Sequence, residues 1–124
     1  MALRLHYETW GEGALPLMLV HGFTGNRTSF DHLRALWSPH VRALVVELPG
    51  HGQTPLPSRP GRDGFLETLE AFFAVLDEVG VPRTNILGYS QGARFALAAV
   101  MSRPERFTRL ILESGSPGLH RRQA

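Results

Sequence analysis

The chain has 124 residues, which is enough for one hydrophobic core and too few for two domains. With 43% hydrophobic residues, 19% charged residues and a net charge of +2, it has the composition of a soluble globular domain and lacks the basic excess of a nucleic-acid-binding protein. The absence of cysteine excludes disulfides and thiolate catalysis, and no apolar run approaches the roughly 18 residues of a membrane span, so we expect a cytoplasmic protein without membrane contact.

Five segments have the pattern of β-strands. Residues 3–10 alternate polar and apolar side chains, which predicts an edge strand. Continuous apolar runs predict strands buried on both faces over residues 15–20, 41–48 and 85–89. Residues 109–114 are the last predicted strand.

Three helices are predicted between these strands. Thr28 or Ser29 is expected to cap the first helix, and Pro39 to end it. The predicted buried face of this helix carries Phe30, Leu33, Leu36 and Trp37. The second helix has the most regular apolar spacing and begins with Asp63 as its N-cap. The third covers residues 91–101.

Alternating strands and helices with short connections predict an α/β fold. We expect a mostly parallel sheet with helices on both faces, in a single domain over residues 1–124. Functional loops of such sheets follow the carboxyl ends of the strands. Segments in that position are residues 21–22, residues 49–54, Ser90 and residues 114–118, and we expect them to meet at one edge.

Ser90 stands between a predicted strand and a predicted helix, with Gly88 and Gly92 on either side. This spacing in this context predicts a nucleophile elbow, a sharp strained turn that presents the serine oxygen; an ordinary turn serine is the alternative. A serine nucleophile needs a base and hydrogen-bond donors for the oxyanion that forms. We expect the backbone N–H groups of Gln91 and Phe23 to be those donors.

Other side chains are candidates for substrate contact. Tyr89 adjoins the nucleophile, and Arg94 lies one helical turn after it, where a guanidinium is suited to an anionic substrate; a surface or ion-paired arginine is the alternative. His21 is expected at the site, where it orders its loop through hydrogen bonds rather than acting as a base. His51 is expected to hold its own loop. We expect no metal and no cofactor.

The motifs HGFTG, LPGHGQT and GYSQG together resemble the α/β-hydrolase family over the whole length of the chain. Within it, GYSQGAR and LESGSPGL are most similar to the 2-succinyl-6-hydroxy-2,4-cyclohexadiene-1-carboxylate synthases of menaquinone biosynthesis, which eliminate pyruvate. The resemblance implies that Ser90 is the serine of a Ser-Asp-His triad and that Arg94 helps to hold an anionic substrate.

The resemblance also implies that the triad Asp and His follow two further strands, which this chain does not contain. We assign these roles neither to Glu113, which is the acid in some relatives, nor to His120 near the end. The chain is therefore predicted to be the N-terminal part, incomplete at its C-terminus, of an enzyme; whether it acts alone stays open. The alternatives are a carboxylic-ester hydrolase and a non-catalytic remnant or assembly module.

An incomplete sheet also predicts an exposed apolar edge. The strand over residues 109–114 is expected to pair with the missing half or with another copy of the chain. Sheet residues expected to be only partly covered are Leu17, Leu19, Leu44, Val46 and Leu87.

Overall fold

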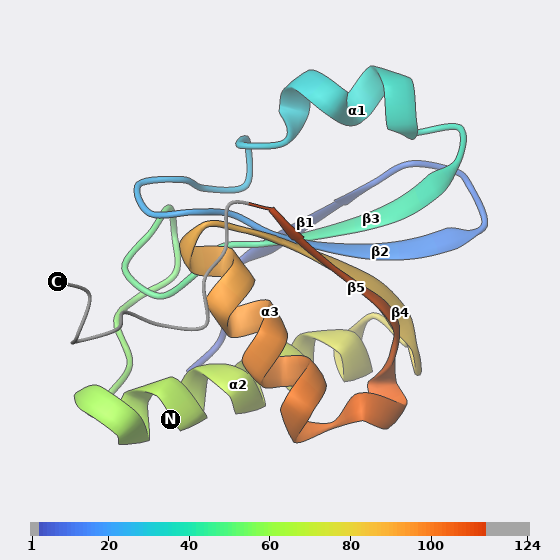
Figure 1. The fold of residues 1–124 in the computed structure, drawn as a ribbon. Coiled ribbons are helices and arrows are strands. Elements are labelled where there is room, and N and C mark those ends of the chain that lie inside the picture. Colours follow the sequence, from blue (N-terminus) through green and yellow to red (C-terminus); the bar gives the residue numbers. More distant parts are fainter. Residues whose placement is uncertain (1–2, 114–124) are drawn as a thin grey trace, which may run out of the picture.

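The computed structural model describes residues 3–113 (Figure 1). Its strands are β1 (Tyr7–Trp10), β2 (Leu15–Val20), β3 (Val41–Val46), β4 (Thr84–Tyr89) and β5 (Phe107–Glu113). Its helices are α1 (Asp31–Trp37), α2 (Gly61–Glu78) and α3 (Gln91–Ser102), and the short 3₁₀ helix η1 (Pro104–Arg106) leads into β5.

The strands form one sheet in the order β1-β3-β2-β4-β5. β1 pairs with β3 in antiparallel orientation, and every other pair is parallel. The prediction of a mostly parallel sheet is therefore confirmed. Because β2 to β5 run in the same direction, their carboxyl ends lie at one edge, on the left of Figure 1.

Helices cover both faces of the sheet, as predicted (Figure 1). Side chains of successive strand residues point to opposite faces, so the apolar strands supply two cores. The core beneath α2 and α3 includes Met18, Val20, Leu44, Val46, Ile86, Phe72, Phe73, Leu76 and Ala96. The core beneath α1 includes Trp10, Leu17, Leu19, Phe30, Ala43, Val45 and Leu87, with Leu33 and Trp37 packed against it.

The expectation of partly covered sheet residues is wrong. All five of the side chains concerned are at most 9% exposed. The reason is that α2 and α3 cover one face of β2, β3 and β4, while Phe30 and α1 cover the other. The side chains in question are Leu17, Leu19, Leu44, Val46 and Leu87.

The strands β1 and β3 are both shorter than predicted, because polar contacts replace the regular strand pairing at their ends. Residues 3–6 precede β1, although Leu3 and Leu5 are buried. β3 ends at Val46 instead of residue 48. The Glu47 N–H still donates to the His6 carbonyl opposite it, but the His6 N–H donates to the Thr54 hydroxyl and the Leu48 N–H donates to the side chain of His21.

The helix starts also differ from the predictions. Neither Thr28 nor Ser29 caps α1; the N-cap is Phe30, and Leu36 is 69% exposed and not part of the buried face. α2 begins two residues before the predicted cap, so Asp63 lies in its first turn. These helices depend on tertiary packing more than on side-chain caps.

β5 begins at Phe107, two residues earlier than predicted, and it forms an edge of the described sheet. Its side chains Ile111 and Leu112 are 46% and 44% exposed. Since neighbouring residues of a strand point to opposite faces, β5 presents apolar surface on both sides. The predicted strand end at Ser114 and the segment 114–118 lie outside the described residues.

Across residues 3–113, no helix combines the length and the apolar character that crossing a lipid bilayer requires.

Two leucine substitutions test this assignment of the core. Leu76→Ala removes a side chain with no exposed surface and should lower the free energy of unfolding by about 2 to 5 kcal/mol. Leu36→Ala makes the same chemical change at an exposed position and should alter it by about 0.5 kcal/mol or less. Urea unfolding of the complete protein measures both. Equal losses would contradict the assignment.

Candidate active site

Ser90 lies in the sharp turn that joins β4 to α3. Its backbone has φ 56° and ψ −115°, a conformation that L-residues rarely adopt. The Ser90 N–H donates to the Glu113 carbonyl at 2.9 Å, and the Ser90 carbonyl accepts from the Ala93 N–H at 3.0 Å. The local geometry is therefore the strained strand-to-helix turn expected of a nucleophile elbow.

Gly88 and Gly92 are required because backbone segments approach closely on both sides of this turn. A Cβ atom on Gly88 would lie 2.7 Å from the Cα of Ala93. A Cβ atom on Gly92 would lie 2.7 Å from the carbonyl carbon of Val20. Neither glycine has a positive φ, so what matters at these positions is the lack of a side chain rather than conformational freedom.

The loop after β2 runs directly against the elbow. A Cβ atom on Gly22 would lie 3.1 Å from the Cβ of Ser90, which places the Gly22–Phe23 peptide beside the serine. Gln91 is the first residue of α3, where backbone N–H groups have no partner within the helix. Both backbone segments named as oxyanion donors thus adjoin Ser90, and their role as donors stays a prediction.

The same loop contains a strained residue that hydrogen bonds hold in place. Thr24 has φ 65°, and its N–H donates to Nε2 of His51 at 3.1 Å. The Gly25 N–H donates to the Gly22 carbonyl at 3.0 Å and closes a turn. Nδ1 of His51 lies 3.1 Å from the Pro49 carbonyl. His51 therefore contacts both its own loop, as predicted, and the loop after β2.

His21 has a structural position, and its prediction as a substrate contact is wrong. The side chain is fully buried, and both ring nitrogens are engaged. Nε2 accepts the Leu48 N–H at 2.9 Å, so the proton is on Nδ1, which donates to the Gly22 carbonyl at 2.7 Å. Burial lowers the pKa of His21, in agreement with a neutral ring. These two hydrogen bonds order the loop after β2, as the sequence predicted for His21.

Tyr89 and Arg94 lie in different hollows. Tyr89 is 44% exposed and lines a pocket of about 620 Å³ together with the loop at residues 22–25 and Glu113. Arg94 is exposed and lines a groove of about 480 Å³ along α3, opposite Phe65 of α2. Tyr89 therefore lies beside the loop that follows β2, but Tyr89 and Arg94 do not line the same pocket.

Gln91 connects the elbow with the groove of Arg94. Its side chain lines that groove, and its Oε1 is buried with no hydrogen-bond partner in the part of the chain that the structure describes. Arg94 likewise has no ion-pair partner among residues 3–113. The groove therefore places a cation and an acceptor, both without a partner among the described residues, next to the apolar side chains of Phe95 and Met101.

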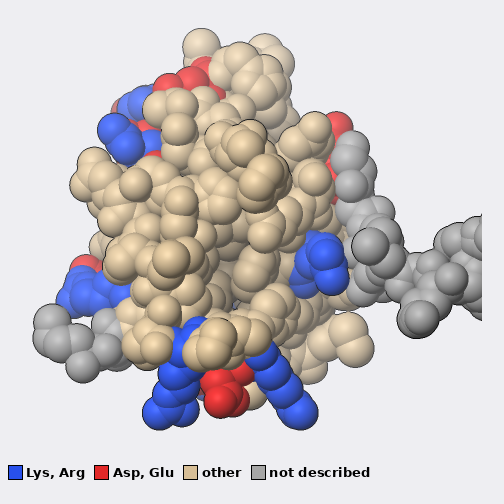
Figure 2. All heavy atoms as spheres, turned by 90° about the vertical axis from the view of Figure 1, so that its left-hand side faces the viewer, with Lys and Arg blue, Asp and Glu red and all other residues tan. Residues whose placement is uncertain are grey.

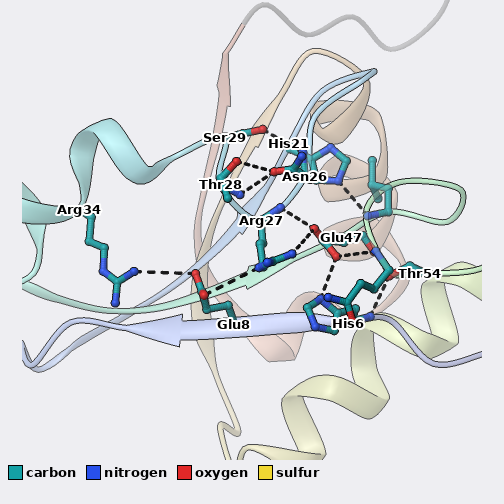
Figure 3. A network of polar contacts seen from close by, with 12 residues as sticks. His6, Glu8, His21, Asn26, Arg27, Thr28, Ser29, Arg34, Glu47 and Thr54 are labelled. Carbon is teal, nitrogen blue, oxygen red and sulfur yellow. Dashed lines mark hydrogen bonds and ion pairs between the residues drawn. The ribbon is translucent and has the colours of Figure 1, made fainter.

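Glu47 is a fully buried carboxylate next to the loop after β2, and it was not among the predicted site residues (Figure 3). Its position in the apolar run LVVEL was the available signal, since a charged residue is almost never fully buried unless it is paired. Burial raises the pKa of the Glu47 carboxyl. Hydrogen bonds from the backbone of Gln53 and Arg27 and from His6 outweigh this effect and hold the pKa below its usual value.

The edge of the sheet that carries these loops has little charge. Figure 2 looks onto this side of the molecule, and charged side chains gather at its margin while the centre is uncharged. Within residues 3–113 no group of three or more His, Asp or Glu side chains is arranged to hold a metal ion.

Comparison with known sequences finds relatives along most of the chain. The sequence profile of the alpha/beta hydrolase fold family matches residues 16–123. A Bacillus subtilis (strain 168) protein named "Putative 2-succinyl-6-hydroxy-2,4-cyclohexadiene-1-carboxylate synthase" is 32% identical over 103 residues, which cover 83% of this chain and 37% of that protein. A Pseudomonas putida protein named "2-hydroxy-6-oxononadienedioate/2-hydroxy-6-oxononatrienedioate hydrolase 2" is 32% identical over 121 residues, covering 94% and 42%.

Solved structures show the same fold. The structure of a marine microorganism esterase superposes with a TM-score of 0.87 at 20% identity, over 99% of this chain and 46% of that one. This chain thus spans less than half the length of the curated relatives and of the solved structure.

Two substitutions at the elbow test the strain at Ser90. Ser90→Gly removes the Cβ that makes φ 56° unfavourable, which relieves about 1 to 3 kcal/mol of strain and costs about 0.5 to 1 kcal/mol in unfolded-state entropy. Ser90→Ala also lacks the hydroxyl but keeps the Cβ. We expect the glycine variant to be the more stable by roughly 1 kcal/mol in urea unfolding of the complete protein, and equal stabilities would argue against strain.

Proposed function

The chain belongs to the alpha/beta hydrolase fold family, and we propose from this premise that it forms the nucleophile-bearing part of a serine-dependent enzyme. The observation that carries the proposal is the strained turn at Ser90, with the Gly22–Phe23 peptide packed beside it. Strained backbone is costly and is characteristic of functional sites. The family alone would not carry the proposal, because one fold hosts many functions.

In this proposal the Ser90 hydroxyl is the reacting group, acting as nucleophile or as partner in proton transfer. The N–H groups of Phe23 and Gln91 stabilise the negative charge that develops on a carbonyl oxygen. The general base that activates Ser90 comes from the part of the complete protein outside this chain, since the curated relatives are more than twice as long.

For the reaction itself we propose elimination of pyruvate to form 2-succinyl-6-hydroxy-2,4-cyclohexadiene-1-carboxylate. Similarity to the Bacillus subtilis relative supports this choice. Arg94 supports it independently, because its guanidinium lies beside an apolar groove without an ion-pair partner in the described part of the chain, and such a group is suited to a substrate with carboxylates. The name of the Pseudomonas putida relative also refers to a dicarboxylate, so a small anionic substrate agrees with the names of both relatives.

Release of pyruvate by the complete protein tests this reaction. Ser90→Ala should lower kcat by at least about a thousandfold, because the reacting hydroxyl is lost. Arg94→Ala should mainly raise KM, and Arg94→Lys should raise it less, since the charge remains without the bidentate fork. Undiminished pyruvate release in Ser90→Ala would refute the role of Ser90.

The same variants separate the alternatives. A generic carboxylic-ester hydrolase would turn over neutral p-nitrophenyl esters rapidly and would be indifferent to Arg94→Ala. A non-catalytic module would leave Ser90 unlabelled by a fluorophosphonate, which reacts only with an activated serine.

We also propose that the free edge of β5 pairs with the remainder of the complete protein. Ile111 and Leu112 supply exposed apolar surface on the two faces of β5, and a strand of that kind at the edge of the described sheet is prone to pair with another strand. The relatives are more than twice as long as this chain, and we propose that the corresponding remainder of the complete protein supplies the strand that pairs with β5. Pairing with a second copy of this chain is the alternative outcome.

Light scattering during size-exclusion chromatography of the 124-residue chain tests the edge. We expect a species larger than a monomer, because the edge then has only other copies to pair with, and we expect Ile111→Lys to shift it towards the monomer. Leu56→Lys places the same charge at another exposed leucine and should have no effect. A monodisperse monomer that unfolds cooperatively would contradict the proposal.

A further inference from the structure

Glu47 joins three segments that are far apart in the sequence (Figure 3). Its Oε2 accepts the backbone N–H of Arg27 at 2.8 Å. Its Oε1 accepts the backbone N–H of Gln53 at 2.9 Å and lies 2.8 Å from Nδ1 of His6. A fully buried carboxylate therefore bridges the loop after β2, the loop after β3 and the segment before β1.

The bond to Arg27 fixes the far side of the candidate oxyanion loop. This loop runs from Gly22, beside Ser90, through the strained Thr24 to Arg27. A non-glycine residue with positive φ persists only where the surrounding contacts impose it. The backbone bond to Glu47 is one of those contacts, and it lies four residues after the donor Phe23.

The hydrogen bond to Gln53 holds the segment that makes a second contact with the loop after β2. Gln53 belongs to the segment that carries His51, whose Nε2 accepts the Thr24 N–H. The backbone at Gly52 also lies directly against the Glu47 carboxylate, because a Cβ atom on Gly52 would collide with the Glu47 Cδ. Glu47 thus holds the loop directly at Arg27 and indirectly through His51.

We propose that Glu47 is a positioning residue that sets the Phe23 N–H in its place beside Ser90, an inference that rests on the proposed function. Glu47 touches no reacting atom in this proposal. It acts through the loop, so its loss should weaken transition-state stabilisation while leaving ground-state binding in place.

Glu47→Gln is the decisive variant because a carboxamide has one acceptor oxygen and one donor group. Whichever way the amide turns, its NH₂ faces the N–H of either Arg27 or Gln53, and one loop loses its anchor. Glu47→Asp keeps the charge and both oxygens, and we expect it to retain more activity than Glu47→Gln. The matched control is Glu8→Gln, since within residues 3–113 the Glu8 carboxylate pairs with the Arg27 and Arg34 guanidinium groups alone, each at 3.9 Å.

Kinetics of the complete protein provide the first measurement. We expect Glu47→Gln to lower kcat roughly ten- to a hundredfold, within the range for loss of one oxyanion donor, with KM changed by about twofold or less. Glu8→Gln should keep both parameters. An unchanged kcat in Glu47→Gln, or an equal loss in Glu8→Gln, would overturn the proposal.

Hydrogen–deuterium exchange without substrate provides the second measurement and stays informative if the enzyme assay shows no turnover. Failure of the proposed function leaves the wild type inactive, whereas failure of this inference leaves the loop equally protected in wild type and Glu47→Gln. We expect faster exchange over residues 22–29 in Glu47→Gln, with residues 15–20 of β2 unchanged. Equal loss of protection in β2 would overturn the proposal, because Glu47 would then stabilise the whole fold instead of this loop.

Discussion

The arrangement of this molecule depends on the close contact of α3 with β2 and β4. Gly88 and Gly92 permit it, since any larger residue would collide with the backbone of Ala93 or Val20. The contact brings the first turn of α3 to the carboxyl end of the central strands and forces the chain through the strained turn at Ser90. Packing of α3 on the sheet therefore offsets the strain that exposes the serine.

Besides this packing, polar contacts hold the loop after β2 in place beside the elbow. The loop after β2 has no regular secondary structure, and its strained residue, Thr24, donates its N–H to His51 of the loop after β3. Glu47 and His21 are both buried, and both carboxylate oxygens of Glu47 and both ring nitrogens of His21 form hydrogen bonds. Buried polar groups with every partner in place favour a single arrangement, whereas leaving one unpaired costs about 1 to 3 kcal/mol.

The two side chains predicted to contact substrate, Tyr89 and Arg94, lie in different hollows. Tyr89 and the loop at residues 22–25 line one pocket, while Arg94 and Gln91 line a separate groove along α3. If Arg94 binds a substrate carboxylate as proposed, it does so from outside the pocket that Tyr89 lines.

The sequence alone determined the features that depend on neighbours along the chain. Apolar runs specified the buried strands of a parallel sheet, and the G-x-S-x-G spacing specified the turn at Ser90, because strand and helix periodicity and the need for glycine are local properties. Tertiary structure decided the ends of β3 and α1, the burial of His21 and the separation of Tyr89 from Arg94. It alone also joined Glu47 to Arg27 and Gln53, since such contacts exist only after crossover connections bring distant loops to the same edge of the sheet.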